Sequence, residues 1–111
     1  QGLINDPPFF QFILGVAGGA PATAKHLLHL VDSIPSGANW SVGALGRHQL
    51  PMNTLAIAMG GHARTGLEDN IYLHKGQPGS NAQLVERLVD IARLFGREVA
   101  TPAQAREILQ L

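Results

Sequence analysis

The chain has 111 residues, no net formal charge and no cysteine, and its hydrophobic share of 45% far exceeds its charged share of 14%. Because soluble domains are usually ~25% charged, we expect much of this surface to be covered by protein outside the sequence. Because the charges balance, the sequence lacks the excess of basic residues that nucleic-acid and anionic-membrane binding require. No apolar run approaches the ~20 residues of a membrane span. Without cysteine there are no disulfides or thiolate metal sites, which, with no visible signal peptide, fits a cytoplasmic protein.

The first half of the chain predicts two strands that are each followed by a helix. Residues 1–8 predict a loop, and residues 9–16 form an aromatic and branched run that ends in glycines, typical of a buried strand. Gly18 and Gly19 belong to the turn that follows, and a helix is predicted over residues 24–34. The next pair is a strand over residues 39–45 and a helix over residues 50–59, with a proline in the first turn of that helix.

The second half predicts one more strand and two helices. The strand is predicted over residues 62–67. Two capping-box patterns follow, in which a Ser or Thr side chain and a Gln three residues later satisfy free backbone N–H groups. The boxes Ser80–Gln83 and Thr101–Gln104 predict helices over residues 81–95 and 102–110.

The alternation of strands and helices predicts an α/β fold with right-handed crossovers and a parallel sheet. The first strand lacks clean alternation, which suits a sheet covered on both faces. Three strands cannot close a barrel, and a (β/α)8 barrel needs about 250 residues. We therefore expect residues 1–111 to be a partial TIM-barrel domain that contains about the last three βα units and a terminal helix. Because the sequence opens on Gln1 rather than Met, we also expect a mature or clipped amino terminus. A complete but small open α/β domain is the alternative.

Residues 62–70 carry the candidate chemistry. In an extended strand alternate residues share a face, so Arg64, Gly66 and Glu68 are expected to point the same way, with Asp69 just beyond the strand. Active sites of barrels gather at this carboxyl end. A guanidinium orients a neighbouring carboxylate and favours its ionised form, which gives a positioned base, and a second carboxylate can bind a divalent cation. A purely structural ion pair fits the same spacing, so spacing alone leaves both interpretations open.

The string Gly-Gly-His-Ala-Arg-Thr-Gly-Leu-Glu-Asp-Asn at residues 60–70 resembles the eighth-strand signature of the β-keto acid cleavage enzymes, the family of the 3-keto-5-aminohexanoate cleavage enzyme. Residues 12–23 resemble the family's sixth strand and loop, and residues 40–49 its seventh strand. Residues 80–85 and 96–102 resemble its final helical region. The resemblance therefore extends over nearly the whole chain.

The resemblance implies a zinc-dependent acyltransferase that converts a β-keto acid and acetyl-CoA to acetoacetate and a new CoA thioester by Claisen and retro-Claisen chemistry. Glu68 matches the carboxylate ligand of the zinc, whose two histidine ligands are expected in an early strand that this sequence lacks. Asp69 matches the general base and Arg64 its partner. Zinc would polarise the keto oxygen while Asp69 removes the adjacent carbon-bound proton. The resemblance also implies a homo-tetramer acting on small molecules, and a chain of 111 residues that is inactive by itself.

Four further residues are weaker candidates for binding substrate or CoA. Arg47 and His48 follow the second predicted strand, at the presumed catalytic end. Gly18 and Gly19 precede a helix start, where backbone N–H groups can cradle a phosphate, although paired glycines are more often turn residues. Two other functions stay open: a non-catalytic α/β interaction module, and another metal-dependent barrel enzyme such as an aldolase. Thr65 stands where we expect a branched aliphatic residue in many relatives, and its side chain is expected to face away from the barrel axis.

Overall fold

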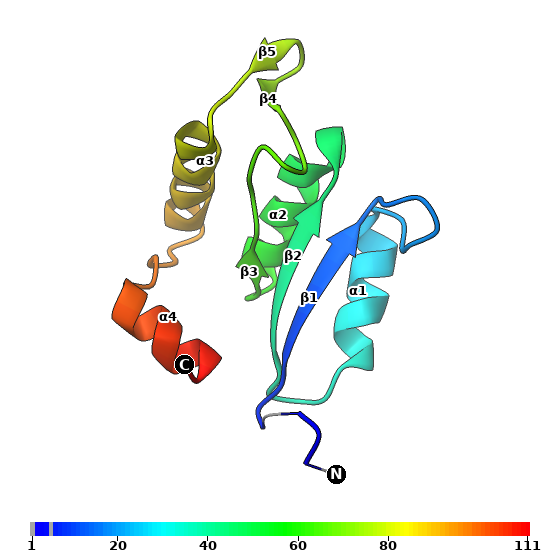
Figure 1. The fold of residues 1–111 in the computed structure, drawn as a ribbon, viewed down its shortest axis with the longest axis vertical. Coiled ribbons are helices and arrows are strands. Elements are labelled where there is room, and N and C mark those ends of the chain that lie inside the picture. The colour runs from blue at the N-terminus through cyan, green and yellow to red at the C-terminus, as the bar shows by residue number, and fades with distance from the viewer. Residues whose placement is uncertain (1, 5) are drawn as a thin grey trace.

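The computed structural model describes residues 2–4 and 6–111, so that Gln1 and Asn5 of the predicted amino-terminal loop lie outside the described residues. Its centre is a parallel sheet in which three strands stand in the order β1-β2-β3 (Figure 1). The elements of this part are β1 (Phe9–Leu14), α1 (Ala24–Ser33), β2 (Asn39–Ala44), the 3-10 turn η1 (Gly46–His48), α2 (Gln49–Ala58) and β3 (His62–Ala63). The chain is therefore α/β with a parallel sheet, as the alternation of its segments predicts.

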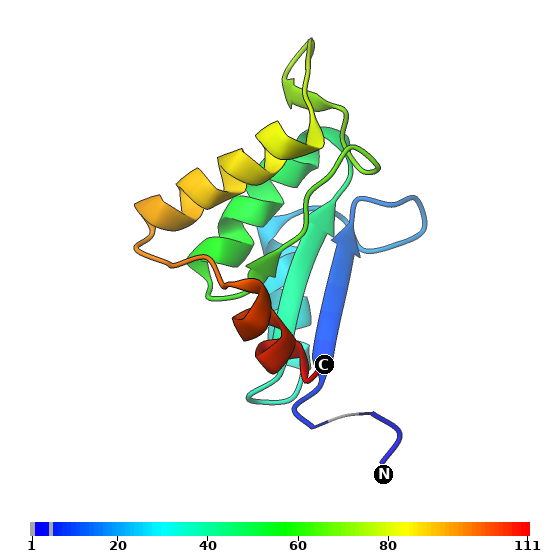
Figure 2. The ribbon, with the colours of Figure 1, turned by 60° about the vertical axis from the view of Figure 1, so that its left-hand side comes forward.

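The rest of the chain is a small hairpin followed by two helices. The hairpin is antiparallel and projects beyond the carboxyl ends of the parallel strands (Figure 1). The sequence pattern does not predict this hairpin. The third helix packs beside α2, and the last helix lies toward the amino ends of the strands (Figure 2). These elements are β4 (Tyr72–His74), β5 (Gln77–Pro78), α3 (Asn81–Leu94) and α4 (Pro102–Leu109). None of the described helices is long and apolar enough to cross a membrane.

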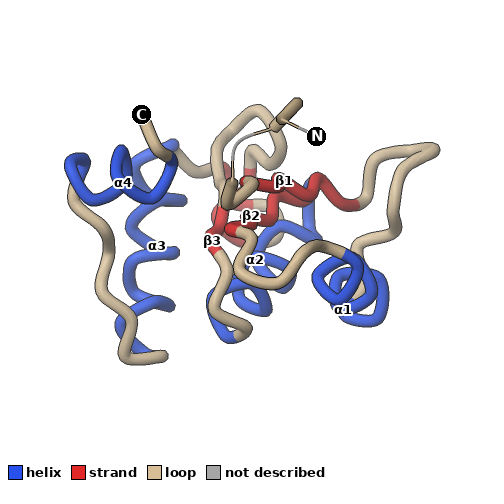
Figure 3. Tube along the Cα trace, turned by 90° about the horizontal axis from the view of Figure 1, so that it is seen from below, coloured by secondary structure: helices blue, strands red, loops and turns tan. Residues whose placement is uncertain are grey.

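Helices α1 and α2 cover the same face of the parallel sheet (Figure 3). On that face every second residue of the strands packs into one core, as the two-residue period of a strand requires. The buried core consists of Leu14, Leu27, Trp40, Val42, Ala44, Met52 and Ala56. The opposite face carries Ser41 and Gly43 of β2, with the side chain of Ile13 beside Gly43. In the described part of the chain this second face is not covered by a helix.

The third strand is much shorter than predicted, which corrects the expectation of a strand over residues 62–67. β3 pairs with β2 only at His62 and Ala63, and one further backbone bond of 2.8 Å runs from the Arg64 N–H to the Val42 carbonyl oxygen. Beyond that point the carbonyl groups of the segment bond to side chains of α2 rather than to a neighbouring strand. Gly66 then takes a φ of 153°, and the chain enters a turn.

The other ends of elements follow from local chemistry. β1 ends at Leu14 rather than at residue 16, because Gly15 adopts a φ of 84° that a strand does not contain. Both capping boxes are confirmed: the hydroxyl of the cap accepts the N–H of the Gln three residues later, and the Gln side chain accepts the N–H of the cap. Helix α1 begins after Thr23, whose side chain accepts the His26 N–H at 3.2 Å. A 3-10 turn leads directly into α2, which therefore begins at Gln49.

Candidate active site

Two buried amides of α2 fix the chain just after β3. Gln49 and Asn53 are four residues apart on this helix, and both are completely buried. The Asn53 Nδ2 group donates to the carbonyl oxygen of Arg64 at 3.1 Å, and the Gln49 Nε2 group donates to that of Gly66 at 3.4 Å. The Thr65 hydroxyl donates to Gln49 Oε1 at 2.9 Å, so Thr65 points into α2. Helix α2 thus holds residues 64–66 through the hydrogen bonds of Gln49 and Asn53.

A turn then brings the acidic residues back toward Arg64. The N–H groups of Asp69 and Asn70 both donate to the Gly66 carbonyl oxygen at 3.3 Å. The loop after β2 supports the turn, because the Gly46 N–H donates to the Asp69 carbonyl oxygen at 2.7 Å. The amino end of α3 supports it from another side, because Asn81 Oδ1 accepts the Leu67 N–H at 2.8 Å. The turn is therefore anchored by three elements that are distant in sequence.

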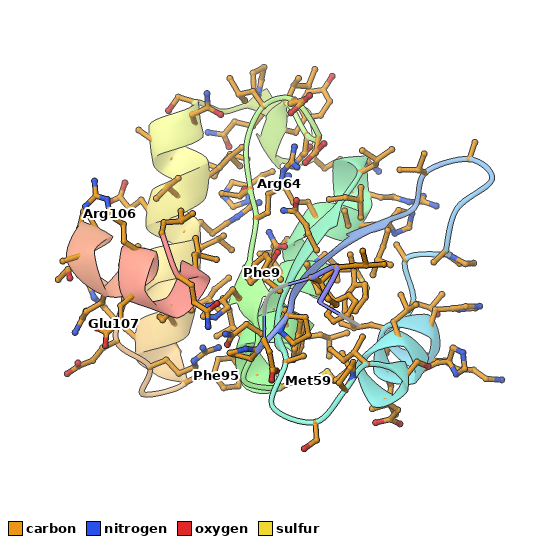
Figure 4. All side chains as sticks on the ribbon, turned by 60° about the horizontal axis from the view of Figure 1, so that its bottom comes forward. Phe9, Met59, Arg64, Phe95, Arg106 and Glu107 are labelled. Atoms are coloured by element: carbon orange, nitrogen blue, oxygen red, sulfur yellow. The ribbon has the colours of Figure 1, made fainter. Side chains whose placement is uncertain are left out.

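Arg64 contacts both acidic side chains of this turn. Its Nη2 atom lies 2.9 Å from Glu68 Oε2, and its Nε atom lies 3.5 Å from Asp69 Oδ2. The structure thus brings together the three residues that the sequence singled out, but by a route that corrects the prediction. Since the strand ends at Ala63, Arg64 and Glu68 do not share a strand face, and the turn closes the distance between them. Figure 4 labels Arg64 on this segment.

Gly43 of β2 lies beside the Arg64 side chain. A Cβ atom at position 43 would lie 3.6 Å from both Cβ and Cδ of Arg64, and 3.1 Å from Cδ1 of Ile13. The sheet face beneath Arg64 is the one that α1 and α2 leave uncovered. The guanidinium therefore projects from the carboxyl end of the sheet over its open face.

The two carboxylates differ in their access to solvent. The side chain of Asp69 is 10% exposed and that of Glu68 is 82% exposed. A shielded carboxylate oriented by a guanidinium suits proton transfer, whereas an exposed one can reach a ligand supplied from outside. The described residues contain no group of three His, Cys, Asp or Glu side chains placed to hold a metal ion.

The weaker candidates lie in the loops that follow β1 and β2. Gly18 has a φ of 81°, and the Gly19 N–H is used within the turn, where it donates to the Val16 carbonyl oxygen at 2.9 Å. Arg47 and His48 belong to η1, and Arg47 is exposed. Within the described residues, neither forms a hydrogen bond or ion pair with the three residues of the turn. These residues share an edge of the sheet with Arg64 but are not joined to it.

Sequence reasoning missed the two residues that position the site. Gln49 and Asn53 lie one helical turn apart, and polar side chains with this spacing in a mostly apolar helix predict a shared polar contact on one face. Asn81 was interpreted only as the start of a helix. Its contact with Leu67 joins residues fourteen positions apart and has no local pattern.

Comparison with known proteins places the chain in a family. A family model described as beta-keto acid cleavage enzyme matches residues 1–111. The chain is 52% identical over 110 residues to the 3-keto-5-aminohexanoate cleavage enzyme of Acetoanaerobium sticklandii, an alignment that covers 98% of this chain and 40% of that enzyme. It is 51% identical over 112 residues to the enzyme of the same name from Fusobacterium nucleatum, covering all of this chain and 40% of that enzyme.

A third relative carries a different name. The 3-dehydrocarnitine:acetyl-CoA trimethylamine transferase of Rhizobium meliloti is 37% identical over 111 residues, covering all of this chain and 37% of that protein. The chain thus spans about 40% of the length of the cleavage enzymes that it matches. Since the family match extends over all 111 residues, this chain belongs to the beta-keto acid cleavage enzyme family.

Proposed function

We propose that the protein to which these residues belong converts a β-keto acid and acetyl-CoA to acetoacetate and a new CoA thioester. The observation that carries this proposal is the contact of one guanidinium, that of Arg64, with the two carboxylates of Glu68 and Asp69 at the carboxyl edge of the sheet. Family membership supports it, as do the names of relatives, which combine a keto acid with cleavage or with acetyl-CoA.

We also infer that residues 1–111 form part of the wall of a (β/α)8 barrel, about the last three βα units with a terminal helix. The strands are parallel and follow one another in sequence order, and both crossover helices lie on the same face. This is the arrangement of a singly wound barrel, in which helices form an outer ring around the strands. The uncovered face, with Gly43 and the adjacent Arg64 side chain, would then line the barrel interior.

In this proposal Asp69 is the general base. It takes the proton from the carbon next to the keto group, and the carbanion, stabilised as an enolate, forms a bond to the acetyl carbon of acetyl-CoA. CoA leaves as a thiolate and then attacks the original keto carbon, so that the bond between this carbon and the alpha carbon breaks. The electron pair stays on the alpha carbon, which takes back the proton held by Asp69 and leaves as acetoacetate. Arg64 holds the carboxylate in place through its contact of 3.5 Å. General base catalysis of this kind contributes roughly 10²–10⁴-fold in rate.

Glu68 is proposed as one ligand of a zinc ion whose remaining ligands, two histidines by family resemblance, come from outside this chain. Its high exposure leaves the carboxylate accessible to such an ion, and carboxylate oxygen is an ordinary zinc donor. When bound, zinc would supply Lewis-acid stabilisation of negative charge on a substrate oxygen. The described residues 2–4 and 6–111 do not by themselves complete a site for it.

The reaction is tested with the full-length protein, by following acetoacetate release from acetyl-CoA and a panel of β-keto acids. We expect Asp69→Asn to lower kcat at least about a hundredfold, because the base is lost. Asp90→Asn is the matched control, since Asp90 also lies 3.5 Å from an arginine but in an exposed pair on α3. Unimpaired turnover by Asp69→Asn, or no acetoacetate from any β-keto acid, would contradict the proposal.

The metal role has a readout that does not depend on turnover. We expect the full-length protein to be purified with zinc, and Glu68→Gln to contain far less of it by elemental mass spectrometry. Glu107→Gln is the control, because Glu107 is an exposed residue of α4, far from Arg64 in Figure 4. Equal zinc in the two variants would remove Glu68 from the ligand set.

A further inference from the structure

A cleft lined by several cationic side chains lies next to the candidate active site. It has a volume of about 670 Å³, is bounded by η1 and the β4–β5 hairpin, and falls within the ~300–1,000 Å³ of ordinary ligand sites. Arg47, His74, Lys75 and Arg87 line it, and among the residues that the structure describes no Asp or Glu does. The whole chain has as many acidic as basic residues, eight of each. The positive charge of this cleft is therefore a local feature and does not reflect the composition.

Arg87 of α3 is the most constrained cation of the cleft. One of its terminal nitrogens donates to the Leu73 carbonyl oxygen, while its Nε atom is buried without a hydrogen-bond partner. No carboxylate among the described residues lies within ion-pair distance of it. Burial lowers the pKa of Arg87 below its ordinary value. A partly desolvated guanidinium without a counter-ion is unfavourable, and a bound anion would offset this cost.

The cleft adjoins the candidate base through its own lining. Asn70, the residue after Asp69, lines the cleft, and so does Gly46, whose N–H donates to the Asp69 carbonyl oxygen at 2.7 Å. The hairpin that bounds the cleft projects beyond the carboxyl ends of the strands, on the side where the turn lies (Figure 1). A ligand could therefore occupy the cleft and reach the turn without crossing the sheet.

We propose that this cleft binds the phosphate groups of the acyl-CoA co-substrate, through Arg47, Lys75 and Arg87. CoA carries its phosphates at the end remote from the thioester, so a nucleotide held in the cleft would leave the pantetheine arm to reach the turn. Arginine forks and lysine ammonium groups are the side chains that bind phosphate most strongly. The inference rests on the proposed function, which requires acetyl-CoA. It adds Lys75 and Arg87 to Arg47, which the sequence had already made a candidate.

The test uses the full-length protein with Arg47→Ala, Lys75→Ala and their double variant. Arg87 is left intact because it also holds the hairpin. CoA binding is measured by calorimetry, and KM is measured for acetyl-CoA and for S-acetylpantetheine, which lacks the nucleotide and all phosphates. We expect the double variant to bind CoA about tenfold more weakly and to show a matching rise of KM for acetyl-CoA only. Lys25→Ala on α1 is the matched control, because Lys25 is exposed and does not line the cleft.

The outcomes distinguish a failure of the cleft assignment from a failure of the proposed reaction. Three results would each overturn the assignment of the cleft. They are an unchanged CoA affinity in the double variant, no CoA binding by the unmodified protein, and an equal rise of KM for both thioesters. Weaker CoA binding in the double variant, with no acetoacetate formed from any thioester, would keep the cleft and reject the proposed reaction. Acetyl-dephospho-CoA, which lacks the 3′-phosphate, identifies which phosphate the cleft binds.

Discussion

Asn53 binds the backbone of Arg64: its side-chain amide donates a hydrogen bond of 3.1 Å to the Arg64 carbonyl oxygen. Asn53 is completely buried in α2, and Arg64 is the residue whose guanidinium contacts both carboxylates of the turn. The helix on one side of the sheet thereby fixes a charged group on the other side. The candidate site thus depends on a residue that contacts only the backbone of Arg64 and neither of the two carboxylates.

We expect Asn53→Ala to lower both stability and activity. An unpaired Arg64 carbonyl costs about 1–3 kcal/mol, partly offset because Oδ1 of Asn53 is itself buried without a partner. A net loss of about 1 kcal/mol in the free energy of unfolding should appear in denaturant titration. Because Arg64 is no longer held, kcat for acetoacetate release should fall by roughly ten- to a hundredfold.

Thr54→Ala is the matched control for that experiment. The Thr54 hydroxyl donates to the Leu50 carbonyl oxygen at 2.7 Å, entirely within α2. The two residues are neighbours, but only Asn53 is bonded to the segment after β3. An equal loss of kcat in both variants would indicate damage to the helix and would reject a positioning role for Asn53.

The contact of Thr65 with Gln49 should be measurable as an energetic coupling. Thr65→Val keeps the shape of the side chain but removes the hydroxyl that donates to Gln49 Oε1, which leaves a buried acceptor unpaired. We expect a loss of about 1–2 kcal/mol in unfolding free energy, and a much smaller loss when Gln49 is already replaced by Ala. Additive effects in this double-mutant cycle would mean that the two side chains do not interact in solution.

His62 should make stability fall in mild acid. Its ring stacks on Phe9, with ring centroids 6.4 Å apart. Burial lowers the pKa of His62 below 6.5, and the positive charge of Arg97 lowers it further. The fold thus favours neutral His62, while the unfolded chain takes up a proton near pH 6.5. The stabilisation is complete above about pH 6.5 and is lost as pH falls toward the folded-state pKa, because the unfolded state then binds more protons.

The measurement is the Tm of the full-length protein between about pH 8 and pH 5. We expect His62→Gln to reduce the fall of Tm with acid, since this variant removes the titrating group. His29→Gln on the exposed side of α1 is the control and should leave the slope unchanged. A slope that is the same in the unmodified protein and in His62→Gln would show that His62 does not contribute to it.

Two glycines should respond differently to alanine. A Cβ atom at Gly61 would lie well inside van der Waals contact with the rigid indole ring of Trp40, whereas at Gly43 its nearest neighbour, 3.1 Å away, is the flexible end of Ile13. We expect Gly61→Ala to cost about 1–3 kcal/mol of unfolding free energy, and Gly43→Ala to cost less. Equal stability of the two variants would contradict the packing around Trp40.

The features that the sequence predicted correctly depend on local chemistry. The capping box of Ser80 and Gln83 needs only residues three apart, and so it is found where the pattern lies. The parallel sheet follows from the alternation of apolar strands and amphipathic helices. The residues of the turn, Arg64, Glu68 and Asp69, could be singled out because they are adjacent in sequence and resemble a family signature.

The features that were missed depend on contacts between distant residues. The strand was extended to residue 67 because nothing in residues 64–67 shows that Asn53 and Gln49 take their carbonyl groups. The hairpin was missed because its strands are two and three residues long and Pro78 lies in one of them, which weakens any strand pattern. The positively charged cleft cannot be predicted from the sequence, because η1 and α3 bring Arg47 and Arg87 together only in the folded chain.

Three side chains from the carboxyl-terminal part of the chain hold residues 61–73 by their backbone. Arg97 donates to the Gly61 carbonyl oxygen at 2.6 Å, Asn81 accepts the Leu67 N–H, and Arg87 donates to the Leu73 carbonyl oxygen. Peptide groups are the same for every residue except proline, so these anchors tolerate changes in the side chains between them. These anchors therefore set the path of the segment without using its side chains. Replacement of an exposed side chain in it, such as Ile71, should leave this path unchanged.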